Sequence, residues 1–268
     1  MTSDNQETSK TSNRVALVTG GTRGIGQEIS KKLKKDGFFV IANYASNEQK
    51  ASDFSNETGI ETVKWDVSNY EECSGQIQKI YDKYKTIDVL INNAGISGGT
   101  ALTENTSIED WNDTINVNLN GMFYFAKFAI PLLKKNKRAS VINISSTAGL
   151  FGVPQRSPYA ASKWGVIGFT KTLAMELGPN QINVNAICPG CVDGERIKGV
   201  IKADAKESGY SYQQIKDVYL RQSSMRSVAD KNDIAAMCYF LCSKSGSQIS
   251  GQAIAIDGNT EGLFNWLE

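Results

Sequence analysis

A chain of 268 residues is long enough for one large domain with a sizeable hydrophobic core, or for two small domains. Hydrophobic residues make up 40% and charged residues 21%, as in ordinary globular proteins, and a net charge of +1 gives no overall attraction to nucleic acid or to an anionic membrane. No apolar run reaches the length of a membrane span, because Lys127 and Pro131 interrupt the longest candidate, 122–133.

The first thirteen residues are almost wholly polar and lack the apolar segment of a secretory signal. We therefore predict a disordered leader over residues 1–13, one domain over residues 14–268 and a cytoplasmic location.

Seven short apolar runs, rich in β-branched residues, alternate with helical patterns along the rest of the chain. They are 15–18, 38–41, 61–64, 89–91, 141–144, 182–187 and 253–256. Strands that are apolar on both faces and alternate with helices indicate a parallel sheet covered on both sides. The sequence thus predicts an α/β fold, a single-domain, Rossmann-type, doubly wound parallel sheet of about seven strands with helices on both faces.

A glycine-rich segment, Thr19-Gly-Gly-Thr-Arg-Gly-Ile-Gly26, follows the first run and leads into a helical pattern. Glycines allow a close approach of the backbone, and a helix N-terminus offers unpaired N–H groups, so this turn suits a pyrophosphate. The spacing Gly20-x-x-x-Gly24-x-Gly26 differs from the standard G-x-G-x-x-G fingerprint. A glycine-rich turn without a ligand is the alternative.

The region around the end of the second run, 40–45, contains no Asp or Glu that could bind the adenosine ribose of NAD. Arg23, inside the glycine loop, can instead pair with the 2′-phosphate of NADP, and a solvated loop charge is the alternative. The sequence favours NADP(H), with NAD(H) as the alternative.

The chain contains no histidine, which excludes Ser-His and Cys-His nucleophile pairs and most zinc sites. Cys188 and Cys191 have C-x-x-C spacing, but a structural zinc needs four ligands, so we predict no metal. Cys238 and Cys242 stand four residues apart in an apolar helical pattern and are expected to be buried free thiols.

Tyr159 stands four residues before Lys163, so the two side chains share one face of a helix. Delivery of a hydride to a ketone creates an alkoxide, which needs a nearby proton donor. A phenol, with its ordinary pKa of about 10, becomes suitable when an ammonium group lowers that pKa. The pair by itself would equally suit an ordinary surface helix.

Taken together, the motifs resemble the short-chain dehydrogenase/reductase superfamily over residues 14 to about 260. They are, in family order, the Gly20/Gly24/Gly26 loop, Asp66-Val67, Asn92-Asn-Ala-Gly95, Asn116-Val-Asn-Leu119, Ser145-Ser146, Tyr159 to Lys163 and Pro189-Gly190. The segments 43–48 and 255–258 look most like those of the 3-oxoacyl-(acyl-carrier-protein) reductases.

The resemblance implies a catalytic tetrad of Asn118, Ser146, Tyr159 and Lys163. In this interpretation Tyr159 is the acid, Ser146 binds the carbonyl oxygen, and Asn118 anchors a water that relays protons to Lys163. The resemblance further implies that residues 22–26 cradle the pyrophosphate, Asp66 and Val67 meet the adenine, residues 93–95 line the ribose, and Val192 binds the nicotinamide amide. The full set of implied cofactor-binding residues is Gly20, Thr22, Arg23, Gly24, Ile25, Gly26, Asn43, Tyr44, Asp66, Val67, Asn93, Ala94, Gly95, Tyr159, Lys163, Pro189, Gly190 and Val192.

Two features depart from the family pattern. Gly194 stands where the family usually has a threonine that binds the nicotinamide carboxamide. The expected substrate lid, about residues 190–225, is longer than in acyl-carrier-protein reductases, includes a helical pattern over 212–221, and resembles in length the lid of 3-hydroxybutyrate dehydrogenases. Those enzymes handle a small carboxylate, which Arg156 and Arg196 could clamp, unless these arginines pair with Glu195 or solvent.

We therefore expect an NAD(P)(H)-dependent oxidoreductase that interconverts a ketone and a secondary alcohol, on a 3-oxoacyl-type or related small oxo substrate. The alternatives are an NAD-dependent dehydrogenase of a small hydroxy acid and a non-catalytic dinucleotide sensor, against which the complete tetrad argues. The resemblance implies a homo-oligomer, a tetramer or a dimer. The net charge and the lack of a long apolar run predict no nucleic-acid or membrane partner. The apolar segment 263–267 is expected to pack on a neighbouring subunit or on its own domain.

Overall fold

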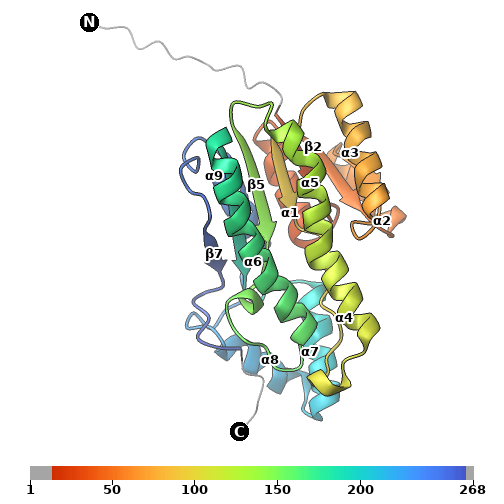
Figure 1. Cartoon of the computed structure of the whole chain (residues 1–268). Coiled ribbons are helices and arrows are strands. Elements are labelled where there is room, and N and C mark those ends of the chain that lie inside the picture. The colour runs from red at the N-terminus through yellow and green to blue at the C-terminus, as the bar shows by residue number, and fades with distance from the viewer. Residues whose placement is uncertain (1–13, 264–268) are drawn as a thin grey trace, which may run out of the picture.

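The computed structural model of the chain describes residues 14–263 and contains one parallel sheet of seven strands. The strand order is β3-β2-β1-β4-β5-β6-β7, and every neighbouring pair is parallel (Figure 1). The strands are β1 (Val15–Val18), β2 (Phe39–Tyr44), β3 (Glu61–Lys64), β4 (Val89–Asn92), β5 (Ala139–Ile144), β6 (Ile182–Pro189) and β7 (Ala253–Ile256). The predicted fold class is confirmed. The predicted leader, residues 1–13, and most of the apolar segment 263–267 lie outside the described residues.

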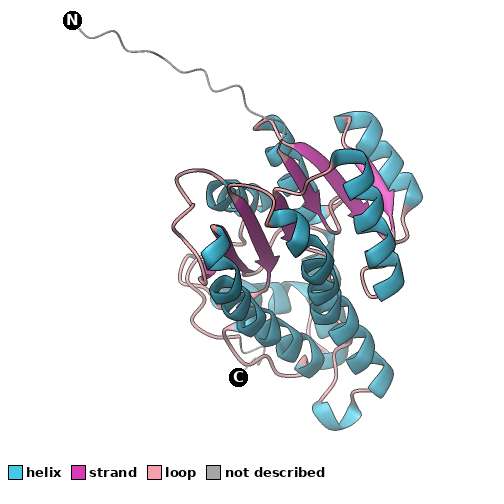
Figure 2. Cartoon of the chain, turned by 45° about the horizontal axis from the view of Figure 1, so that its top comes forward, coloured by secondary structure: helices cyan, strands magenta, loops and turns pink. Residues whose placement is uncertain are grey.

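Helices cover both faces of this sheet (Figures 1 and 2). One face packs against α1 (Gly24–Lys35), α2 (Glu48–Thr58) and α9 (Lys231–Cys242), and the other against α3 (Tyr70–Tyr84), α5 (Gly121–Leu133) and α6 (Ser157–Leu177). The strands alternate accordingly, because Val15 and Leu17 join the α3–α5–α6 core while Ala16 and Val18 join the α1–α2–α9 core. None of the helices within residues 14–263 is both long and apolar enough to cross a membrane.

Cys238 and Cys242 are buried free thiols on α9, as predicted. The C-x-x-C pair is also free, and burial raises the pKa of Cys188 to about 11 and that of Cys191 to about 12. Within residues 14–263 no group of three or more potential metal ligands comes together. Because their pKa values are raised, the Cys188 and Cys191 thiols are protonated and weakly reactive at neutral pH.

The segment predicted to form a lid contains two helices, α7 (Glu195–Ser208) and α8 (Tyr212–Arg221). Figure 1 shows them beyond the carboxyl ends of the strands. α8 matches the predicted helix, and it begins with a capping box of Ser211 and Gln214. The sequence interpretation missed α7, in which Gly199 lowers the intrinsic helix propensity in the middle of the helix.

Candidate active site

The glycine loop lies between the carboxyl ends of β1 and β4, where the strand order reverses direction and ligands of such sheets bind. The Thr19 hydroxyl accepts the N–H groups of Asn93 at 2.9 Å and Ala94 at 3.0 Å, and the Asn93 amide donates to the carbonyl of Gly20 at 3.1 Å. These contacts fix the glycine loop against the segment after β4. Thr19 was not among the predicted site residues, although a polar residue directly after an apolar strand could have indicated it.

This loop requires glycine for two different reasons, close backbone approach and positive φ angles. A Cβ on Gly26 would lie 2.2 Å from the carbonyl oxygen of Gly20, so the backbones approach too closely for any side chain. Gly20 and Gly24 have φ angles of +60° and +58°, and a Cβ on Gly24 would meet nothing within 4 Å. Thr22 is buried, while Ile25 packs on the α1–α2–α9 core. The N-terminus of α1 therefore faces open space, as a pyrophosphate requires.

The adenosine side of the site carries no carboxylate on β2. Asn43 is buried, where its side chain accepts the N–H of Gly20 at 3.1 Å and donates to the carbonyl of Trp65 at 3.0 Å, so Asn43 supports the glycine loop. Asp66 is exposed after β3, and Arg23 is an exposed residue at the start of α1. Tyr44 and Val67 flank this region, the first partly buried at the end of β2 and the second in the core.

The backbone after β6 has an arrangement that suits an amide ligand. Gly190, next to Pro189 at the end of β6, donates its N–H to the carbonyl of Ile256 at 3.1 Å. Val192 forms a parallel bridge with Ala229, whose own hydrogen bonds go to the residues on either side of Val192. The pairing thus does not use the N–H and C=O of Val192.

Gly194 adopts a φ of +147°, a conformation that a threonine would rarely adopt. A Cβ at this position would lie 3.4 Å from Cε of Lys231. Gly194, which stands where the family usually has a threonine, therefore has a backbone conformation that favours glycine.

Lys163 fixes α6 to the end of β5. Its ammonium is buried and donates to the carbonyl of Ile144 at 2.9 Å, while the Ser145 hydroxyl donates to the carbonyl of Lys163 at 2.8 Å. Burial lowers the pKa of Lys163, and the positive charge of Arg196 lowers it further, whereas Tyr159 opposes both effects. The ammonium lies 5.7 Å from the centre of the Tyr159 ring.

The phenol of Tyr159 lies among several groups that favour its ionisation. Burial by itself raises the pKa of Tyr159, but the charges of Lys163 and Arg196 lower it. A hydrogen bond with the Ser146 hydroxyl and the charge of Arg156 lower it as well. The net result is a pKa below the ordinary value of a tyrosine. This is the direction expected for a general acid that works near neutral pH.

Asn118 lies in a π-helical turn, Asn116–Asn120, between α4 (Ile108–Ile115) and α5. Such turns recur at functional sites because they redirect side chains. The Asn118 side chain exchanges two hydrogen bonds with the backbone of Ile96, at 2.8 and 2.9 Å, and donates to Ser162 at 3.1 Å. Ser162 in turn donates to the carbonyl of Tyr159 at 2.7 Å. Asn118 therefore joins the segment after β4 to the helix that carries Tyr159.

The segment at Gly95 completes the cluster. A Cβ on Gly95 would lie 2.9 Å from Oδ1 of Asn118 and 3.6 Å from Nζ of Lys163. Arg196, from α7, donates to the carbonyl of Gly95 at 3.2 Å. The structure thus brings the four predicted tetrad residues, Gly95 and Arg196 to one place at the carboxyl edge of the sheet.

The two arginines expected near the substrate have different environments. Arg196 contacts the cluster directly, whereas Arg156 is buried and forms an ion pair with Asp204 at 3.1 Å. Glu195 pairs with Lys198 at 3.0 Å. Neither arginine has the Glu195 partner that the sequence suggested as an alternative.

Comparison with known proteins agrees with this geometry. The model of the short chain dehydrogenase family matches residues 14–205. The chain belongs to the short chain dehydrogenases. It is 38% identical over 245 residues to the acetoacetyl-CoA reductase of Shinella zoogloeoides, which covers 91% of this chain and 97% of that protein. It is 36% identical over 251 residues to the 3-oxoacyl-(acyl-carrier-protein) reductase of Chlamydia muridarum, which covers 92% and 96% respectively.

A solved structure of similar architecture contains a nicotinamide dinucleotide. A variant of the actinorhodin polyketide ketoreductase with NADPH superposes with a TM-score of 0.86 and 31% identity over 95% of this chain and 98% of that chain. The predicted family and reaction class are confirmed. This short chain dehydrogenase is an NAD(P)(H)-dependent oxidoreductase that interconverts a ketone and a secondary alcohol.

Proposed function

We propose that this short chain dehydrogenase reduces the ketone of a 3-oxoacyl thioester to the secondary alcohol with NADPH. The observation that carries the proposal is the position of Tyr159 between the Lys163 ammonium and the Ser146 hydroxyl, with its pKa lowered. The acyl thioester class is supported by the names of the relatives in Shinella zoogloeoides and Chlamydia muridarum.

NADPH, when bound, supplies the hydride that attacks the carbonyl carbon. The Ser146 hydroxyl donates a hydrogen bond to the carbonyl oxygen and so fixes its position beside Tyr159. The Tyr159 phenol transfers its proton to that oxygen as negative charge develops on it. The Lys163 ammonium then stabilises the phenolate that remains, because it shares the same helix face one turn away. Asn118 holds the segment after β4 against α6 through its hydrogen bonds with Ile96 and Ser162.

Along the carboxyl edge of the sheet, described residues suit each part of the cofactor. The N-terminus of α1 at Gly24 would bind the pyrophosphate, the backbone of Val192 would bind the nicotinamide amide, and Gly95 would line the ribose. Arg23 would pair with the 2′-phosphate, and within residues 14–263 its guanidinium has no ion pair that would compete. This is why we propose NADPH over NADH.

The environment of the arginines favours a thioester over a free carboxylate. A small oxo acid would need two guanidinium groups in reach for the clamp that the sequence suggested. Arg156 is already paired with Asp204 inside the protein, which leaves Arg196 alone at the cluster. A dehydrogenase of small hydroxy acids is therefore the less suitable alternative. The five free cysteines agree with a reducing compartment, and we propose the cytoplasm.

The test is a comparison of acetoacetyl-CoA with free acetoacetate as substrates of the purified full-length chain, with NADPH and with NADH. Turnover of the thioester with NADPH at a kcat/KM well above that of the free acid supports the proposal. A preference for the free acid, or for NADH, contradicts it.

The role of Tyr159 is tested by Tyr159→Phe, which keeps the ring and removes the proton donor. We expect kcat to fall by about 100- to 10,000-fold while NADPH binding, measured by fluorescence titration, stays near that of the wild type. Tyr210→Phe, at an exposed tyrosine between α7 and α8, is the matched control and should keep the wild-type rate. A Tyr159→Phe enzyme with more than a tenth of the wild-type rate would show that another group is the acid.

A further inference from the structure

The two lid helices have a small apolar core of their own. The buried apolar residues of α7 and α8 are Ile201, Ile215 and Val218, and the two helices pack mainly against each other. The remaining buried residue of α7 is a carboxylate, Asp204. Asp204 is thus the one buried charged residue on α7 and α8, and its side chain contacts the body of the enzyme.

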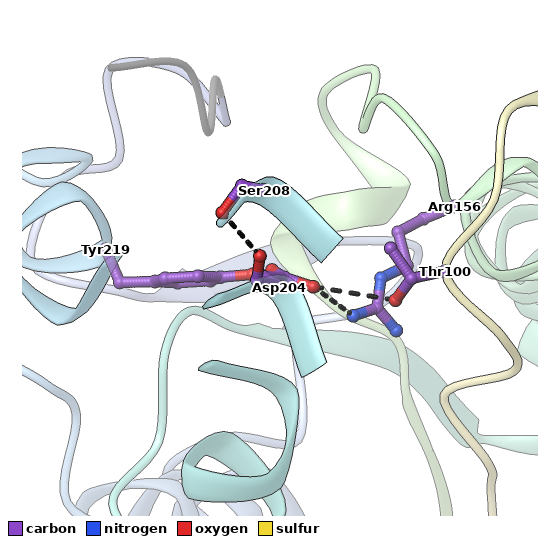
Figure 3. Close-up of polar contacts among 5 residues, drawn as sticks. All are labelled: Thr100, Arg156, Asp204, Ser208 and Tyr219. Atoms are coloured by element: carbon purple, nitrogen blue, oxygen red, sulfur yellow. Dashed lines mark hydrogen bonds and ion pairs between the residues drawn. The ribbon is translucent and has the colours of Figure 1, made fainter. Parts of the chain in front are cut away.

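Figure 3 shows these contacts converging on one carboxylate. Oδ1 of Asp204 accepts hydrogen bonds from the Arg156 guanidinium at 3.1 Å and from the Thr100 hydroxyl at 3.5 Å, and Oδ2 accepts from the Tyr219 hydroxyl at 2.5 Å. Both side chains of the ion pair are only 9% exposed. Because the ion pair is largely removed from water, neither charge can take solvent as an alternative partner.

The partners of Asp204 come from three other parts of the chain. Thr100 lies in the segment after β4, Tyr219 lies on α8, and Arg156 is the residue at the start of α6, three positions before Tyr159. The segment after β4 and the segment before α6 also touch each other directly, through the N–H of Ala101 and the carbonyl of Gln155 at 3.0 Å. One carboxylate thus joins both lid helices to the two segments that border the tetrad.

The phenol of Tyr219 is suited to a permanent contact of this kind. Burial raises the pKa of Tyr219, and the negative charge of Asp204 raises it further. The hydroxyl therefore stays protonated over the whole working pH range and always donates to Asp204.

We propose that Asp204 is a positioning residue that latches the lid helices α7 and α8 to the first turn of α6 and so holds the substrate side of the site in place beside Tyr159. We call the contacts of Asp204 with Arg156, Thr100 and Tyr219 the lid latch. Asp204 acts through Arg156 and does not touch the reacting atoms. Its effect on substrate kinetics rests on the proposed function, whereas its effect on the lid does not.

The variant Asp204→Asn tests the lid latch, because it keeps the shape of the side chain and removes its charge. Amide hydrogen exchange, resolved by segment, reports on the lid without any turnover. We expect exchange in residues 195–221 to accelerate by at least about tenfold, while exchange in β1, β4 and β5 stays at the wild-type rate. Ser208→Ala is the matched control, because the Ser208 hydroxyl lies one turn further on α7 and donates only to the backbone carbonyl of Asp204, at 2.6 Å. Exchange in this control should be unchanged.

Kinetics provide the second measurement on the same two variants. With acetoacetyl-CoA as the substrate, we expect Asp204→Asn to raise KM by about tenfold or more, with a smaller fall in kcat and an NADPH dissociation constant close to that of the wild type. Ser208→Ala should change none of the three. A purely structural role would lower the amount of folded enzyme and leave KM of the remainder unchanged.

The proposal is overturned if Asp204→Asn leaves lid exchange at the wild-type rate, or accelerates exchange equally in the lid and the sheet. If Asp204→Asn does not fold, Tyr219→Phe decides, since it removes the hydroxyl that donates to Asp204 and leaves the ion pair. Faster exchange confined to α7 and α8 in Tyr219→Phe then supports the lid latch, and unchanged exchange overturns it. Absence of thioester turnover in the wild-type enzyme would contradict the proposed function alone, because lid exchange is measured independently.

Discussion

The charges that lower the pKa of the Tyr159 phenol most come from two helices, α6 and α7. Lys163 lies on the same helix, so its effect follows from a spacing of four residues that is visible in the sequence. Arg196 comes from α7, and its charge lowers the pKa of Tyr159 as well as that of Lys163. The lid thus contributes to the chemistry of the site through its charge, in addition to any contact with substrate.

This dependence predicts a change in the pH profile of Arg196→Met. Removal of a cation disfavours the phenolate, so the pKa of Tyr159 rises toward its ordinary value and the phenol stays protonated to higher pH. Ketone reduction requires the protonated phenol, and its rate falls as pH rises through the pKa of Tyr159 in the wild type. We expect this falling limb, in a profile of kcat, to move to higher pH in Arg196→Met. Lys198→Met, an exposed lysine on the same helix, should leave the limb in place, and an identical profile for both variants would contradict the assignment.

Arg23 determines the choice of cofactor in our interpretation. Arg23→Ser removes the only guanidinium of the glycine loop, and we expect KM for NADPH to rise by about ten- to a hundredfold, with little change in KM for NADH. The comparison of the two cofactors in initial-rate kinetics separates a lost phosphate contact from a damaged loop. Lys35→Ser, at the far end of α1, removes a charge of the same sign and should affect neither cofactor. Equal losses with both cofactors would reject the role of Arg23.

At the level of elements, two glycines in helices should respond oppositely to alanine. A Cβ on Gly26, in the first turn of α1, meets the carbonyl of Gly20 at 2.2 Å, so Gly26→Ala must push the glycine loop out of place. We expect this to cost about 1–3 kcal/mol of unfolding free energy and to weaken NADPH binding. Gly75 lies exposed inside α3 with nothing within 4 Å of its Cβ, and Gly75→Ala should stabilise the protein by about 0.5–1 kcal/mol. Denaturant unfolding and NADPH titration of both variants check the pair, and a stable, cofactor-binding Gly26→Ala would contradict the geometry.

The sequence predicted the central strands β1, β4, β5 and β6 well, because a strand buried on both faces requires a largely apolar run, and such runs are local. The run 141–144, for example, lies within β5 (Ala139–Ile144). α8 was also predicted, because its amphipathic pattern and its cap lie within one short segment. The lid latch could not be predicted. Asp204 and Arg156 are far apart in the sequence, and nothing in the neighbourhood of either residue indicates the other.

Within the candidate site, too, local patterns could be predicted and contacts between distant residues could not. The tetrad could be named because its motif is local at Tyr159 and Lys163 and ordered along the chain elsewhere. The hydrogen bonds of Asn118 with Ile96 and Ser162 depend on a π-helical turn that no spacing rule indicates. Sequence reasoning therefore named candidate residues for the site and missed the contacts that the structure gives them.

For the whole molecule, the parallel sheet explains why residues from distant segments meet. All the strands point the same way, so the segments after β1, β4, β5 and β6 lie at one edge. Thr19, Gly95, Ser146 and Gly190 each stand within a few residues of a strand end. The order of strands then decides which segments are neighbours, and β1 beside β4 places the glycine loop next to Gly95.

The outer surface of α5 and α6 predicts an assembly of several copies of the chain. Trp164 and Met175 on α6 are 52% and 83% exposed, and Phe123 on α5 is 46% exposed and packs against Phe169. Large exposed apolar side chains are typical of a protein–protein interface where they form one patch. We expect light scattering of the wild-type chain to give the mass of a dimer or a tetramer, and Trp164→Glu to lower that mass. Met225→Glu changes another exposed apolar side chain, outside these two helices, and should leave the mass unchanged. A monomeric wild-type chain, or an unchanged mass in Trp164→Glu, would show that this face is not the interface.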